Sequence, residues 1–169
     1  GTALLYGTTG TFTITEILSR IAVNPTIMTP VFHLGAWMVL AGFLFKVAAV
    51  PFHMWMPDVY EGAPAPITGF MTTGIKAASF AAFVRVFIAL GYGKDLEAAM
   101  GGRLHDVLWV IAALTMLIGN VIALTQTNLK RTLAYSSIEH TGYILVGMIA
   151  APASEAGFAP VVMYLATYT

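Results

Sequence analysis

Two lysines, Lys46 and Lys76, interrupt stretches of sequence that are otherwise almost wholly apolar, and Pro51 follows the first of them closely. A charged side chain at the centre of a membrane-length helix costs about 2.5–3.5 kcal/mol on insertion scales, so such residues are rare and usually functional. Burial disfavours the charged ammonium and a nearby carboxylate favours it, so a buried lysine can bind and release a proton when its surroundings change. The two lysines are therefore candidates for proton transfer within a membrane.

Lys76 lies near the middle of its apolar stretch. At helical spacing its neighbours on one face are small or polar, namely Gly69, Thr72, Thr73 and Ser79. Such a face can hold water against a neighbouring helix, as a proton relay requires. The alternative is that Lys76 pairs with a carboxylate and only holds helices together.

Lys46 precedes a proline that should interrupt its helix. Pro51 lacks an amide hydrogen and clashes with the carbonyl four residues back, at Val47. The freed carbonyl must find another partner, and at membrane depth an irregular backbone is tolerated only inside protein or beside a wet cavity. Discontinuous helices of this kind form ion sites in transporters, which favours a role for Lys46 at a helix break. The alternative is a simple kink with a lysine that reaches the interface.

His140 lies in a later apolar stretch, with Ser136, Ser137 and Thr141 on nearly the same helical face. Imidazole titrates near about pH 6.5 when unperturbed, so His140 could extend a polar path beyond Lys76. The alternative is a structural histidine that donates to a carbonyl. The remaining candidates are His53 as a relay or cap after the break, His33 and His105 at span ends, and Asp58, Glu61 and Glu139 as ion-pair partners.

The composition indicates a membrane protein. Of the 169 residues, 58% are hydrophobic and 9% are charged, and the mean hydropathy is +0.80, whereas an ordinary soluble domain carries about 25% charged residues. The formal net charge is zero and there is no basic run, which argues against a nucleic-acid partner. The absence of cysteine excludes disulfides and thiolate metal sites within this chain. There is no phosphate-binding glycine loop and no carboxylate cluster at metal-ligand spacing.

These residues must be positioned by an all-α bundle of transmembrane helices, because about 20 apolar residues in a helix span the hydrocarbon core. We expect a single transmembrane domain over residues 1–169, with an amphipathic helix at about 15–23. The expected spans are 30–60, broken around Pro51, then 66–90, 106–125, 132–151 and a partial span at 158–169. Both ends are apolar, which indicates a fragment of a longer protein.

Two longer motifs carry a family resemblance. They are residues 45–66, FKVAAVPFHMWMPDVYEGAPAP, followed by Lys76 and Arg85, and residues 126–143, QTNLKRTLAYSSIEHTGY. The chain closely resembles the antiporter-like membrane subunits of respiratory complex I over nearly its whole length. The PDVYEGAP form is similar to that of the N-type subunits of bacterial NADH–quinone oxidoreductase.

The resemblance implies a subunit of about fourteen transmembrane helices, each of about 20 residues. This chain would carry the end of the sixth helix, the broken seventh helix through to the tenth, and part of the eleventh. Lys46 then matches the lysine near the break, and Lys76 matches the central lysine of the eighth helix, in a line of buried ionisable groups along which protons move. His140 falls where related subunits carry polar relay residues, which is a weaker correspondence.

On this resemblance we expect proton translocation coupled to NADH–quinone oxidoreduction, by a non-redox subunit of that enzyme in the multi-pass bacterial inner membrane. The chain would bind no cofactor, since NADH, flavin, iron–sulfur clusters and quinone would belong to other subunits. Its partners would be the other membrane subunits of complex I, the lipid bilayer and protons. A subunit of a cation/proton antiporter or membrane hydrogenase is the nearest alternative, and a structural membrane scaffold is an alternative of another class.

Overall fold

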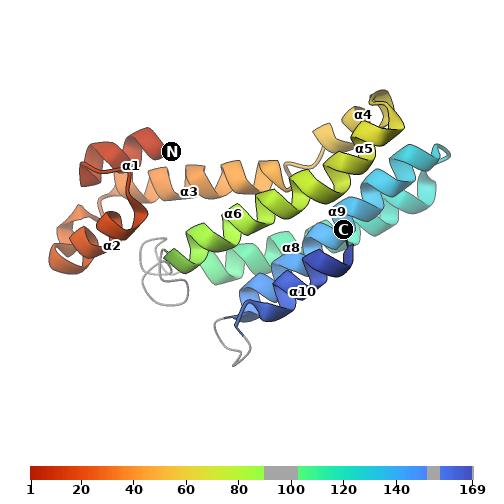
Figure 1. The fold of residues 1–169 in the computed structure, drawn as a ribbon. Helices are drawn as coiled ribbons and strands as arrows, with labels where there is room; N and C mark the ends of the chain where they lie inside the picture. The colour runs from red at the N-terminus through yellow and green to blue at the C-terminus, as the bar shows by residue number, and fades with distance from the viewer. Residues whose placement is uncertain (90–102, 152–156, 169) are drawn as a thin grey trace.

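The computed structural model describes residues 1–89, 103–151 and 157–168, and within these ranges every regular element is a helix (Figure 1). The all-α class expected from the sequence is confirmed. Residues 90 and 169, the expected ends of two spans, lie outside the described residues. The elements are α1 (Thr2–Thr9), α2 (Ile14–Val23), η1 (Pro25–Ile27), α3 (Pro30–Lys46), α4 (Trp55–Gly62), α5 (Ala65–Phe70), η2 (Met71–Ile75), α6 (Lys76–Ala89), α8 (Leu104–Thr125), α9 (Leu129–Ala150) and α10 (Ala159–Tyr168).

Two continuous helical segments in the described ranges are long and apolar enough to cross a membrane, Ala65–Val86 and Leu104–Thr125. The second of them, α8, exposes the large apolar side chains of Trp109, Leu117 and Leu124. Exposed apolar surface of this kind marks contact with lipid or with other protein. The amphipathic helix expected near residue 15 is also present, as α2.

The helix around Pro51 is broken, as the sequence predicted. α3 ends at Lys46, and the chain resumes a helical course only at Trp55, where α4 begins. Between them Ala48 has a φ of 57°, which is uncommon for a residue with a Cβ atom. The surrounding helices must therefore hold this stretch of backbone in place.

α5, η2 and α6 form one helical segment whose middle is a π-helical turn, η2, directly before Lys76. Thr72 and Thr73 donate hydrogen bonds to the carbonyl of Gly69 at 2.7 and 3.0 Å in this turn. Short π-helical turns inside α-helices are frequent at functional sites. The hydrophobic pattern of the sequence did not predict this irregularity.

α8 and α9 form a hairpin whose helices approach each other closely at glycines. A Cβ atom on Gly142 would lie 2.5 Å from Cγ of Met116, and one on Gly119 would lie 3.0 Å from the amide nitrogen of Glu139. Small residues at such contacts are typical of helix pairs in membranes. The turn before α9 is capped by Asn128, whose side chain accepts a hydrogen bond from the following helix at 3.0 Å.

α9 packs against both sides of the break. The main apolar core joins α9 to α3, α6, α8 and α10, and includes Leu44, Phe83, Leu108, Leu145 and Val161. A smaller cluster packs the break and α4 against α9, and consists of Ala48, Met56, Tyr60, Ala134 and Ile138. Figure 1 shows the turn after α4 and the turn between α8 and α9 at the same end of the molecule. α9 is therefore placed to connect the break with Lys76.

Candidate functional site

Lys76 is the first residue of α6 and is buried, with 4% of its surface exposed. Its ammonium group donates to the backbone carbonyl of Ser137 on α9 and, at 2.8 Å, to the Ser137 hydroxyl. The ring centroid of Tyr168, on α10, lies 5.2 Å from Nζ, which is within the range of a cation–π interaction. Lys76 forms no ion pair with a residue in the described ranges, so the contacts that hold it there are with uncharged groups.

The polar residues expected beside Lys76 on its own helix bond within that helix instead. Thr72 and Thr73 bond to Gly69, and the Ser79 hydroxyl donates to the Ile75 carbonyl at 2.6 Å. The hydrogen-bond acceptors for Lys76 come from α9, which a pattern along one helix does not identify.

Ser137 joins four helices in a buried polar cluster. Its side chain, which is 1% exposed, binds Lys76 and also interacts with the hydroxyl groups of Tyr60 on α4 and Tyr168 on α10. We call Tyr60, Lys76, Ser137 and Tyr168 the Lys76 cluster. Each of α4, α6, α9 and α10 supplies one of its side chains.

His140 lies one turn beyond Ser137 on α9 and is partly buried. Its Nδ1 atom is 2.6 Å from the hydroxyl oxygen of Tyr164, and its ring centroid is 4.6 Å from that of Tyr168. The structure therefore brings His140 and Lys76 to the same tyrosine ring. The other histidines lie elsewhere. His53 is buried within the break, and His33 is partly buried in α3. His105 is exposed, and its Nδ1 atom lies 3.6 Å from the Asp106 carboxylate.

The backbone of the break is bonded by buried threonines from the hairpin. Thr141 of α9 donates to the Val47 carbonyl at 3.0 Å, and Thr115 of α8 accepts a hydrogen bond from the Val50 amide at 3.0 Å. Both threonines are 0% exposed. The prediction that the Val47 carbonyl finds a new partner is confirmed, and the irregular backbone is held inside protein, as membrane depth requires.

Lys46 differs from Lys76 in its surroundings. It is the last residue of α3, its side chain is exposed, and with Met38 and Gly42 it lines an open groove beside α1. In the described parts of the chain Lys46 takes part in no ion pair. The structure thus places one lysine inside the bundle and the other on the described surface, next to the break.

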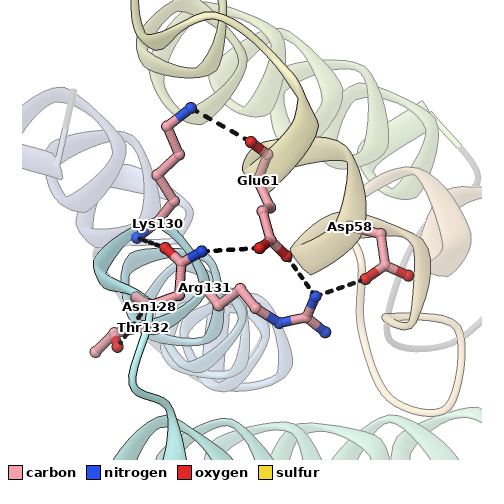
Figure 2. A network of polar contacts seen from close by, with 6 residues as sticks. All are labelled: Asp58, Glu61, Asn128, Lys130, Arg131 and Thr132. Atoms are coloured by element: carbon pink, nitrogen blue, oxygen red, sulfur yellow. Dashed lines mark hydrogen bonds and ion pairs between the residues drawn. The ribbon is translucent and has the colours of Figure 1, made fainter.

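A polar network ties the end of α4 to the start of α9 (Figure 2). Arg131 donates to Asp58 at 2.9 Å and to Glu61 at 2.6 Å. The Asn128 amide donates to Glu61 at 2.8 Å, and the Lys130 ammonium donates to carbonyls at the end of α4 at 2.9 and 3.3 Å. We call these five residues the turn network. Because α4 also carries Tyr60, the network helps to hold that side chain in the Lys76 cluster.

Of the three acidic residues expected in ion pairs, Asp58 and Glu61 pair with Arg131. Glu139 instead accepts hydrogen bonds from Asn120, at 2.9 Å, and from Tyr143. Its carboxylate is therefore engaged by the α8–α9 hairpin.

Combining Arg131→Ala with Glu61→Gln should show that these two side chains stabilise the fold together. Because both side chains are accessible to solvent, which screens their attraction, we expect a small but non-additive effect on the free energy of unfolding. The quantity is measured by thermal unfolding of the detergent-solubilised full-length protein. The pair Arg131→Ala and Glu16→Gln, with Glu16 on the distant α2, should be additive. Additive effects for Arg131 and Glu61 as well would show that the network contributes nothing.

The whole chain, residues 1–169, matches the family described as NADH:quinone oxidoreductase/Mrp antiporter, TM. It is 51% identical over 150 residues to NADH-quinone oxidoreductase subunit N of Myxococcus xanthus (strain DK1622), which covers 89% of this chain and 28% of that protein. It is 46% identical over 169 residues to the subunit N of Trichlorobacter lovleyi, which covers 100% of this chain and 33% of that protein. The chain thus spans no more than 33% of the length of these two relatives.

Two solved structures share the fold. A chain of the membrane-bound sulfane sulfur reductase, an archaeal respiratory membrane complex, aligns with a TM-score of 0.76 at 27% identity, over 97% of this chain and 32% of that chain. A chain of respiratory complex I from Thermus thermophilus with bound aureothin aligns with a TM-score of 0.64 at 34% identity, over 99% of this chain and 32% of that chain. The resemblance to antiporter-like subunits of complex I is confirmed.

Proposed function

Because the chain belongs to the NADH:quinone oxidoreductase/Mrp antiporter transmembrane family, we propose that it forms part of a membrane subunit that translocates protons in step with NADH–quinone oxidoreduction. The observation that carries this proposal is the Lys76 cluster, in which a buried amine is held by a serine and a tyrosine ring. A carboxylate partner would favour the charged form of the lysine, whereas burial among uncharged groups favours release of its proton. We therefore assign proton binding and release to Lys76.

The three candidate residues have different roles in this proposal. Lys76 carries the proton, His140 exchanges it, and Lys46 acts as the gate. The exposed ammonium of Lys46 is available to a carboxylate of an adjacent part of the complex, and a change in that pairing alters the proton affinity of Lys76. A direct connection supports this coupling, because Thr141 and Ser137 lie one turn apart on α9 and bond to the break and to Lys76 respectively.

We further propose that this chain takes no part in electron transfer. The relatives are named as subunits of NADH-quinone oxidoreductase, and NADH, flavin, iron–sulfur clusters and quinone are then bound by other subunits of the complex. Its partners are the other membrane subunits and lipid, in the inner membrane of a bacterial cell. The apolar side chains exposed along α8 support contacts of this kind.

A second candidate function is cation/proton exchange or proton transfer in a related respiratory complex. The family description includes the Mrp antiporter, and the sulfane sulfur reductase chain aligns with a higher TM-score than the complex I chain. Either function can be performed by a buried lysine in this fold, so the Lys76 cluster does not separate them.

Reconstitution of the assembled complex into liposomes separates the candidates. If the proposal is right, addition of NADH and quinone should produce a proton gradient, measured with a pH-sensitive dye. If an imposed sodium gradient produces a proton gradient in the absence of NADH, the antiporter function is favoured instead. Complex lacking this subunit serves as the control, and an undiminished NADH-driven gradient in that control would favour a scaffold.

A further inference from the structure

Two tyrosines of α10, Tyr164 and Tyr168, lie on the same face of that helix because they are one turn apart. The Tyr168 ring centroid lies 5.2 Å from Nζ of Lys76 and 4.6 Å from the ring centroid of His140. The Tyr164 hydroxyl oxygen lies 2.6 Å from Nδ1 of His140. One face of α10 therefore contacts both Lys76 and His140, the two residues between which we propose that the proton is exchanged.

We propose that Tyr168 is a positioning residue for proton exchange between Lys76 and His140, and that Tyr164 holds the imidazole in both of its protonation states. This inference rests on the proposed function. The exchange converts the Lys76 ammonium and a neutral His140 imidazole into a neutral amine and an imidazolium. One proton moves, and the total charge is unchanged.

The Tyr168 ring can stabilise the proton on either side of this exchange. The negative face of an aromatic ring attracts a cation, and the attraction is stronger where water is excluded. Because Tyr168 lies against both Lys76 and His140, its ring favours the charged form of each. Its hydroxyl also interacts with Ser137, the residue that binds Nζ, so the ring and the amine are positioned by a shared partner.

The Tyr164 hydroxyl suits both forms of His140. A hydroxyl group is a donor and an acceptor, so it can donate to Nδ1 of the neutral ring and accept from the Nδ1–H of the imidazolium. A phenylalanine at this position could do neither. Tyr164 therefore keeps the imidazole oriented while its charge changes.

Other titratable side chains face this pair in the described residues. Tyr60 of α4 belongs to the Lys76 cluster, and the Tyr143 ring lies 5.7 Å from that of His140. The Tyr143 hydroxyl donates to Glu139, whose carboxylate also accepts from Asn120. The Glu139 carboxylate also acts electrostatically on His140 and Tyr164.

The test uses the assembled complex with the full-length subunit in liposomes, and measures NADH-driven proton pumping as a function of pH. Tyr168→Leu removes the ring and should slow pumping about tenfold, with the pH profile shifted down by about one unit because the protonated forms lose their stabilisation. Tyr168→Phe keeps the ring but loses the hydroxyl contact with Ser137, so it should slow pumping less than Tyr168→Leu does and shift the pH profile less. Tyr6→Leu, on α1, is the matched control and should change nothing.

Normal pumping by Tyr168→Leu, an equal loss in Tyr168→Phe, or a loss without a shift of the pH profile would each overturn the role of Tyr168. Tyr164→Phe changes the volume little and gives a second test if Tyr168→Leu fails to assemble. It should slow pumping several-fold, and unchanged pumping would overturn the inference for Tyr164. Lys76→Met in the same assay tests the proposed function separately from the roles of the tyrosines. Normal pumping in that variant contradicts the proposed function itself.

Discussion

Replacing Lys76 with methionine should slow proton transfer through this subunit by about 10²-fold or more, which is the usual contribution of a positioned acid–base group. Methionine fills a similar space with an unbranched apolar chain but cannot bind a proton. The Ser137 hydroxyl, which accepts from Nζ at 2.8 Å, would lose its charged donor. The measurement is the rate of NADH-driven acidification in liposomes, divided by the rate of quinone reduction with an uncoupler present.

Ser79→Ala is the matched control for this change. Ser79 is buried on the same helix, but its hydroxyl donates to the Ile75 carbonyl of η2, within the same helical segment. We expect the control to pump normally and both variants to assemble. Equal pumping by Lys76→Met and by the control would remove Lys76 from the proton path.

Replacing Thr141 with valine should destabilise the break by about 1–3 kcal/mol, because the buried Val47 carbonyl would lose the hydroxyl that donates to it at 3.0 Å. Valine has nearly the same shape as threonine, so packing is kept while the donor is removed. A loosened break should also weaken the connection from Lys46 to Lys76 and reduce pumping. The measurements are the free energy of unfolding of the full-length protein in detergent and the pumping rate in liposomes.

Thr132→Val is the control for Thr141→Val. Its hydroxyl lies on the same helix but donates to the Asn128 carbonyl of the preceding turn at 3.1 Å. Substitutions away from buried networks usually change stability by about 0.5 kcal/mol or less. If Thr141→Val costs no more than Thr132→Val, the side-chain bond to Val47 does not hold the break.

The elements that depend on local chemistry could be predicted from the sequence. Pro51 has no amide hydrogen to donate, and its ring clashes with the Val47 carbonyl in any surroundings. The break in the helix and a new hydrogen-bond partner for that carbonyl could therefore be predicted. The polar face of α9 was also visible, because Ser137, His140 and Thr141 recur at helical spacing. In the structure the Ser137 hydroxyl accepts a hydrogen bond from Lys76, and the Thr141 hydroxyl donates one to the Val47 carbonyl.

The contacts between helices could not be predicted in the same way. Periodicity identifies the face of a helix that is polar but not the helix that packs on it, so Tyr60, Thr115 and Tyr168 gave no signal of their roles. The two tyrosines of α10 lie one turn apart in an apolar segment. Their spacing places them on one helix face, but it does not identify the residues that this face contacts. The π-helical turn before Lys76 also depends on tertiary packing, because the residues of that turn fit an ordinary α-helix.

Exposure distinguishes the two lysines in a way that composition did not. Both lie in apolar stretches, yet Lys76 is buried against Ser137 of α9 and the Tyr168 ring of α10, whereas the Lys46 side chain is exposed at the end of α3. A residue at a helix end has neighbours on fewer sides than a residue inside a bundle. The described residues therefore supply hydrogen-bond acceptors for the Lys76 ammonium, and the gating role of Lys46 stays a prediction.

In the proposed mechanism Lys76 gives up its proton and does not merely carry a positive charge. Lys76→Arg separates these two roles, because arginine keeps the charge but stays protonated in proteins. The measurement is the number of protons translocated per NADH oxidised by liposomes that contain the assembled variant complex. If Lys76 is the proton carrier, the ratio should fall in Lys76→Arg to the value found for Lys76→Met. A ratio restored to that of the unmodified complex would show that positive charge alone suffices and would contradict the claim.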